Sequence, residues 1–138
     1  MNKYVVILLI GTVLAMLGGY TVYGQQSGIA SKSTLQPVEV IQFHLEHRCF
    51  SCNNIEKFTR STLLAGYPAI PFKLVNVEKK ENEKLAAQFE ASGSSLFLYN
   101  KVTGKKKDLT KAAFLAAGDQ KKFEQDFRKS MDDFLKGK

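Results

Sequence analysis

The sequence predicts an α/β fold, namely a mixed four-stranded sheet with helices on both faces, preceded by an N-terminal transmembrane helix. Four short apolar runs have strand spacing, at residues 38–45, 72–77, 96–101 and 105–109, and helical spacing recurs between and after them. Two cysteines separated by two residues stand at the start of the first predicted helix, shortly after the first predicted strand. An uncharged apolar stretch at residues 4–23 has the length of a membrane-spanning helix.

The N-terminal part of the chain is predicted to tether the folded domain to a membrane. Residues 1–23 are interpreted as a membrane anchor or uncleaved signal, 24–37 as a flexible polar linker and 38–138 as the domain. Lys3 precedes the apolar stretch and no charge follows before Lys32, so the positive-inside rule keeps the N-terminus in the cytoplasm. We therefore expect a single-pass inner-membrane protein whose C-terminal domain lies in the periplasm.

A cleaved secretory signal is the alternative for the same stretch. Signal peptides share the charged start and the apolar centre, but they usually have a shorter apolar region and a small-residue cleavage site, and no clear A-x-A site follows here. In that case the domain would be secreted to the periplasm. Both interpretations, a retained anchor and a cleaved signal, place the domain outside the cytoplasm.

Composition narrows the classes of partner. The 138 residues carry 20 Lys and Arg against 13 Asp and Glu, a formal charge of +7. The basic residues are spread over predicted helix faces and a turn at 105–107, while the aromatic residues fall at core spacing. We expect a solvated basic face on a monomer, with no nucleic-acid partner.

The predicted elements follow one another at short intervals. The strand at 38–45 leads through the loop 46–48 into a helix that ends at Gly66-Tyr67-Pro68. The strand at 72–77 then completes a right-handed β-α-β unit with parallel strands. Its apolar candidates are Phe72, Leu74 and Val77.

The second half of the domain is predicted to add a hairpin and three helices. A helix at 81–91 buries Leu85, Ala86 and Phe89, and the strands at 96–101 and 105–109 flank a turn containing Gly104. A short helix at 111–117 follows, and Asp119 is a plausible N-cap for the last helix. One face of that helix carries Phe123, Phe127, Met131 and Phe134.

The two cysteines predict thiol chemistry. Cys49 falls at or just before a helix N-terminus, where unpaired amides and the helix dipole stabilise the thiolate, which is the reactive form. Arg48 adds a positive charge beside it. Cys52 lies within one helical turn, close enough to resolve a mixed disulfide formed at Cys49. We predict Cys49 as nucleophile, Cys52 as resolver and Arg48 as the residue favouring the thiolate, with no cofactor beyond the redox-active disulfide.

Two alternatives use the same cysteines. The chain has only two histidines, His44 and His47, which could complete a zinc or copper site with Cys49 and Cys52. If a metal or metalloid site exists, its predicted ligands are Cys49, Cys52 and His47, holding copper, zinc or arsenite. The second alternative is an adaptor whose disulfide is only structural.

The chain resembles the thioredoxin superfamily over residues 38–135. Two segments show the resemblance: VIQFHLEHRCFSCNNIEKF and LVNVEKKENEKLAAQFEASG. More narrowly, Phe43, His44, Arg48, Cys49 and Cys52, with the strand start at Ser94-Ser95-Leu96 and the N-terminal anchor, resemble a small family of membrane-anchored bacterial proteins. That family is described as nitrophenyl-compound nitroreductase subunits and is found with arsenic-resistance genes. The resemblance implies a thioredoxin-like fold and thiol-disulfide oxidoreductase or electron-transfer activity.

The resemblance also implies a substrate groove, at Phe50, Ser51, Ser94 and Ser95. Phe50-Ser51 replaces the Gly-Pro that thioredoxins carry between the cysteines, and Ser95 is nearest the position of their cis-proline. The acid usually buried on the first strand is absent, with Phe43 at or near its place. The implied partners are protein thiols or disulfides, including a multi-span membrane thiol transporter.

Overall fold

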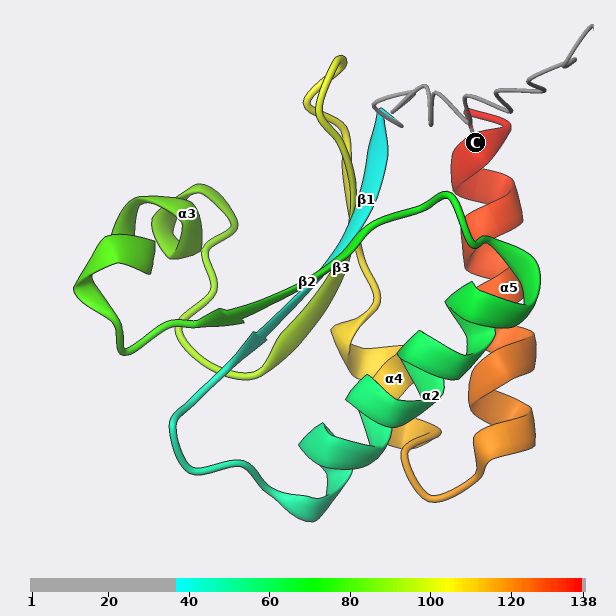
Figure 1. Cartoon of the computed structure of the whole chain (residues 1–138), viewed down its shortest axis with the longest axis horizontal. Helices are drawn as coiled ribbons and strands as arrows, with labels where there is room; N and C mark the ends of the chain where they lie inside the picture. Colours follow the sequence, from blue (N-terminus) through cyan, green and yellow to red (C-terminus); the bar gives the residue numbers. More distant parts are fainter. Residues whose placement is uncertain (1–36, 138) are drawn as a thin grey trace, which may run out of the picture. The chain divides into compact units, whose positions relative to one another are not determined.

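The computed structural model describes residues 37–137 (Figure 1). The predicted membrane anchor at 1–23, and the predicted linker up to residue 36, lie outside the described residues. Within the described part of the chain, no helix is both long enough and apolar enough to span a membrane.

A four-stranded mixed sheet forms the centre of the domain, with the strand order β2-β1-β3-β4. The first strand, β1 (Val38–His44), pairs in parallel with β2 (Phe72–Asn76) and antiparallel with β3 (Ser95–Asn100). The short β4 (Lys106–Asp108) pairs antiparallel with β3, which confirms the predicted hairpin. Six of the seven residues of β1 are buried, as expected for a strand covered on both faces.

Helices cover both faces of this sheet (Figure 1). One face packs against α2 (Phe50–Gly66), α4 (Thr110–Leu115) and α5 (Gln120–Leu135). The other face packs against a one-turn 3₁₀ helix, η1 (Lys80–Asn82), and the short α3 (Glu83–Gln88) with the residues after it. The predicted α/β class is therefore confirmed, and the arrangement is consistent with a thioredoxin-like fold.

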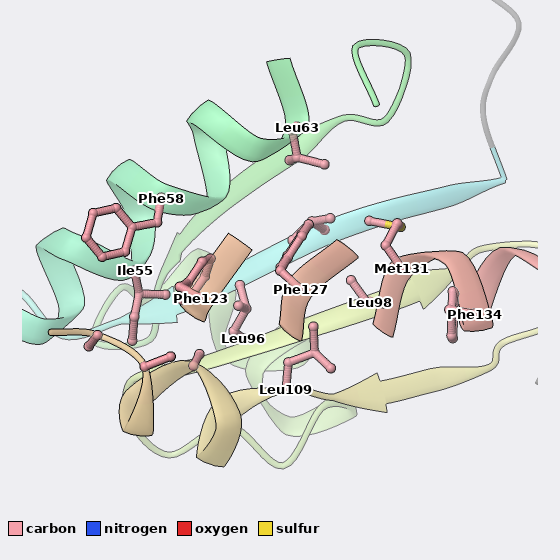
Figure 2. Packing of buried hydrophobic residues seen from close by; sticks show 14 of the residues in the cluster. Ile55, Phe58, Leu63, Leu96, Leu98, Leu109, Phe123, Phe127, Met131 and Phe134 are labelled. Atoms are coloured by element: carbon pink, nitrogen blue, oxygen red, sulfur yellow. The ribbon is translucent and has the colours of Figure 1, made fainter. Parts of the chain in front are cut away.

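The larger core lies between the sheet and α2, α4 and α5 (Figure 2). Asp119 caps α5 as predicted, because its side chain accepts a hydrogen bond from the amide of Lys122 at 3.0 Å. The four apolar residues of the predicted stripe on α5 are all buried: Phe123, Phe127, Met131 and Phe134. The phasing of this helix from sequence was correct.

The strand β2 differs from its prediction in which residue is buried. Phe72, Leu74 and Val77 are only half-buried, whereas Val75 is 5% exposed and joins the core on the α3 side. The half-buried Phe72 packs against the core on the α2 side, whereas Val77 packs against the same core as Val75. Apolar spacing alone could not indicate how deeply each of these side chains is buried.

The predicted helix at 81–91 is shorter in the structure and begins with the 3₁₀ turn η1. It ends because Glu90 adopts a left-handed backbone conformation with φ of 54°, and the amides of Glu90 and Ala91 bond to the carbonyls of Ala87 and Ala86. These two bonds form a Schellman motif, in which glycine is the usual left-handed residue. Ala86 and Phe89 are buried as predicted, but Leu85 is only half-buried.

Candidate functional site

Cys49 is the N-cap residue of α2, which confirms its predicted place at a helix start. Its backbone is extended (φ −73°, ψ 163°), and its Sγ accepts a hydrogen bond from the backbone amide of Cys52 at 3.2 Å. No acidic residue lies in the first turn of α2, so no carboxylate there opposes the positive end of the helix dipole. The sulfur therefore lies where a thiolate is stabilised.

Cys49 and Cys52 form a disulfide with 5.2 Å between their Cα atoms. The two sulfurs differ in access, because Cys49 is exposed whereas Cys52 is 3% exposed. A second molecule can thus reach Cys49 directly, while Cys52 meets mainly atoms of its own chain. This difference is the one that a nucleophile and a resolver require.

Two polar side chains contact Cys52 from the sheet side. Gln42 of β1 is 2% exposed and donates from Nε2 to the carbonyl oxygen of Cys52 at 3.0 Å. Ser94, in the loop before β3, has its Oγ 3.3 Å from the Sγ of Cys52. Ser94 was a predicted groove residue, whereas Gln42 was missed, and no feature of the sequence other than its place on a buried strand pointed to it.

The alternation of β1 explains why Gln42 and not Phe43 lies beneath the dithiol. Successive side chains of a strand point to opposite faces, and Gln42 shares its face with Val40, toward α2. Phe43 points to the opposite face, where its ring packs 5.3 Å from that of Phe89. The β1 side chain that bonds to Cys52 is therefore Gln42, the neighbour of Phe43.

The predicted groove residues separate into two pairs. Ser94 and Ser95 line an open polar pocket together with Gly93, Lys106 and Asp108. Phe50 and Ser51 lie in the first turn of α2, where Phe50 is 78% exposed and Ser51 is half-buried. Ser94 is the groove residue that meets the dithiol, whereas the Oγ of Ser95 bonds back to the Gly93 carbonyl at 3.4 Å. No peptide bond in residues 37–137 is cis.

Arg48 lies along the side of α2 and is not extended into solvent. Its Nη1 donates to Glu56 Oε2, and its Nη2 lies 3.5 Å from the carbonyl oxygen of Cys52. Glu56 also bonds the Nε of Arg60 at 2.8 Å. Burial of Glu56 alone would raise the pKa of its carboxyl, but the hydrogen bonds and charges of Arg48 and Arg60 outweigh burial and hold that pKa below its ordinary value.

The two histidines precede α2: one ends β1 and the other lies in the loop that follows it. His47 is exposed in the loop before α2. His44, at the end of β1, is half-buried and its Nδ1 lies 2.9 Å from the carbonyl oxygen of Leu45. Across residues 37–137, no group of three or more His, Cys, Asp or Glu side chains is arranged to hold a metal ion. Metal binding by Cys49, Cys52 and His47 stays a hypothesis.

Comparison with known proteins does not assign the chain to a family. A scan against protein-family models found no match for it. Searches of curated proteins and of solved structures likewise found none. A function for this chain is therefore inferred from its fold and from the local geometry of Cys49 and Cys52.

Proposed function

We propose that this protein is a thioredoxin-like thiol-disulfide oxidoreductase or electron-transfer protein that works through Cys49 and Cys52. The main support for the proposal is that the two bonded sulfurs differ in exposure and in their position relative to the start of α2. Cys49 is exposed and caps α2, with its Sγ accepting an amide hydrogen bond, while Cys52 is buried directly behind it. A disulfide that served stability alone would need neither the helix N-terminus nor the exposed sulfur.

The reaction is a two-step exchange. The thiolate of Cys49 attacks one sulfur of a partner disulfide, forms a mixed disulfide and displaces the first partner thiolate. Cys52, once deprotonated, attacks the Sγ of Cys49, which regenerates the Cys49–Cys52 disulfide and releases the second partner thiolate. Two electrons pass to the partner, and the protons of the dithiol end on the partner thiols. The same steps in reverse oxidise a partner dithiol.

Alkylation of the reduced protein tests this assignment. We expect iodoacetamide to modify Cys49 at least about tenfold faster than Cys52 at neutral pH, because Cys49 is both exposed and stabilised as a thiolate. Mass spectrometry of peptides from a time course measures both rates. Equal rates would contradict the proposal, and so would tight stoichiometric metal that protects both thiols in the purified protein.

The partner is proposed to be a protein, reached at the periplasmic side of the inner membrane. The support is the uncharged apolar stretch at residues 4–23 behind Lys3 in the sequence. Confinement to a bilayer surface raises the effective concentration of two partners that are both held there. A multi-span membrane thiol transporter is a partner of this kind.

A fusion experiment tests this location. A reporter joined after Lys138 is expected to be active only outside the cytoplasm, and the fusion should stay in the membrane fraction after a high-salt wash. A reporter that works only in the cytoplasm would contradict the proposed topology. A shortened protein in the soluble periplasmic fraction would contradict the anchor and favour a cleaved signal.

A further inference from the structure

Glu56 of α2 bonds two arginines, Arg48 before the helix and Arg60 one turn further along it. Its Oε2 accepts from the Nη1 of Arg48 and its Oε1 accepts from the Nε of Arg60. Only 18% of the Glu56 side chain is exposed, compared with 23% for Arg48 and 54% for Arg60. The contact with Arg48 is therefore the more sheltered of the two, and Arg60 lies on the solvent side.

The contact with Glu56 fixes where the charge of Arg48 lies. Arginine side chains on a surface ordinarily sample many conformations, and their charges are then screened by water and salt. Here the guanidinium is bound to Glu56, and its Nη2 is directed at the Cys52 carbonyl, which also accepts from Gln42. The Nε of Arg48 is buried and makes no hydrogen bond with any described residue. The head group is thus held by its two terminal nitrogens alone.

We propose that Glu56 is a positioning residue for the dithiol, which holds the Arg48 guanidinium against α2 and so sets how strongly its positive charge acts on Cys49. This inference rests on the proposed thiol function and deepens it. The negative charge of Glu56 offsets part of the Arg48 charge, while the hydrogen bond keeps that charge beside the Cys52 carbonyl, in the first turn of α2. Glu56 therefore has two separable effects, one of position and one of charge.

Two substitutions separate these effects. Glu56→Ala removes both the hydrogen bond and the negative charge, so Arg48 is free to move into solvent. Glu56→Gln keeps an oxygen acceptor for Arg48 but removes the charge. Arg48→Gln, made in each background, measures how much the guanidinium raises the alkylation rate of Cys49. The readout is the alkylation rate of Cys49 in the reduced, folded protein at a fixed neutral pH.

We expect Arg48→Gln to slow alkylation of Cys49 about fivefold when Glu56 is present, the size of effect expected for one partly sheltered charge. In the Glu56→Ala background the same substitution should slow it less than about twofold. In the Glu56→Gln background the effect should be about fivefold or larger. Arg60→Gln is the matched control, because it removes the other partner of Glu56 and should leave the effect of Arg48→Gln unchanged.

The proposal is overturned if the effects of the substitutions at positions 48 and 56 on the alkylation rate are additive. If Arg48→Gln slows alkylation equally in the Glu56 and Glu56→Ala backgrounds, Glu56 does not position Arg48. An effect below twofold with Glu56 present would also overturn it, because Arg48 would then act too weakly to need positioning. Failure of the proposed function is a separate result: it would appear as equal alkylation of Cys49 and Cys52, whatever residue stands at position 56.

Discussion

The Cys52→Ser variant is expected to accumulate a covalent adduct with its partner in cells, whereas Cys49→Ser is expected to accumulate little. Thiol exchange passes through a mixed disulfide on the attacking cysteine, and the second cysteine normally releases it. Without Cys52 this intermediate has no internal route to resolution. Cys52 is 3% exposed in the disulfide-bonded structure, so few partner disulfides should reach its thiol when Cys49 is replaced. The expected difference is close to all or none.

Non-reducing electrophoresis of both variants, after rapid acid quenching of whole cells, measures the adducts. A reducing agent should dissolve the adduct band, and the double variant Cys49→Ser with Cys52→Ser should show none. A metal site would lose binding with either substitution and would give no adduct. Equal adduct yields from the two single variants would contradict the assignment of nucleophile and resolver. A multi-span membrane protein in the adduct would support the proposed location as well.

Phe127→Ala is expected to cost about 3–5 kcal/mol in the free energy of unfolding, because it opens a cavity in a packed core. Phe127 is 3% exposed, and its ring stacks on Phe123 with centroids 5.9 Å apart (Figure 2). Phe50→Ala is the matched control, since the same atoms are removed from a helical side chain that is 78% exposed. It should change the stability by about 0.5 kcal/mol or less.

Denaturant titration of the two phenylalanine variants measures this difference. A cost near zero for Phe127→Ala, with an unchanged denaturant slope, would contradict the packing of α5 against the sheet. A large cost for Phe50→Ala would show that Phe50 packs against the domain. In that case Phe50 would not be an exposed side chain beside the two cysteines.

The features that the sequence predicted correctly are those that local periodicity and capping determine. The stripe on α5 was visible because its buried residues recur every three or four positions, and its start was visible because Asp119 is a good N-cap. Cys49 was placed correctly because a predicted strand and a predicted helix meet there. The end of α3 was not visible, because Glu90 takes the left-handed position that glycine usually marks.

The contacts around the dithiol could not be predicted in the same way, because they join residues that are not neighbours in the sequence. Gln42 reaches Cys52 across ten positions and Ser94 reaches it across 42. The ion pair of Arg48 with Glu56 depends on how the loop enters α2, which no spacing rule specifies. Gln42 was missed for a similar reason, since a shift of one residue in a strand exchanges its two faces and apolar spacing does not show which face meets the cysteines.

The reduction potential of the Cys49–Cys52 disulfide distinguishes a dithiol that exchanges with partners from a structural disulfide. The protein, equilibrated with glutathione buffers of defined ratio, is quenched and its free thiols are counted. We predict a midpoint between about −120 and −270 mV, the range of dithiols that exchange with partner proteins. A midpoint below about −300 mV, the range of structural disulfides, would contradict the proposed thiol-disulfide exchange by Cys49 and Cys52.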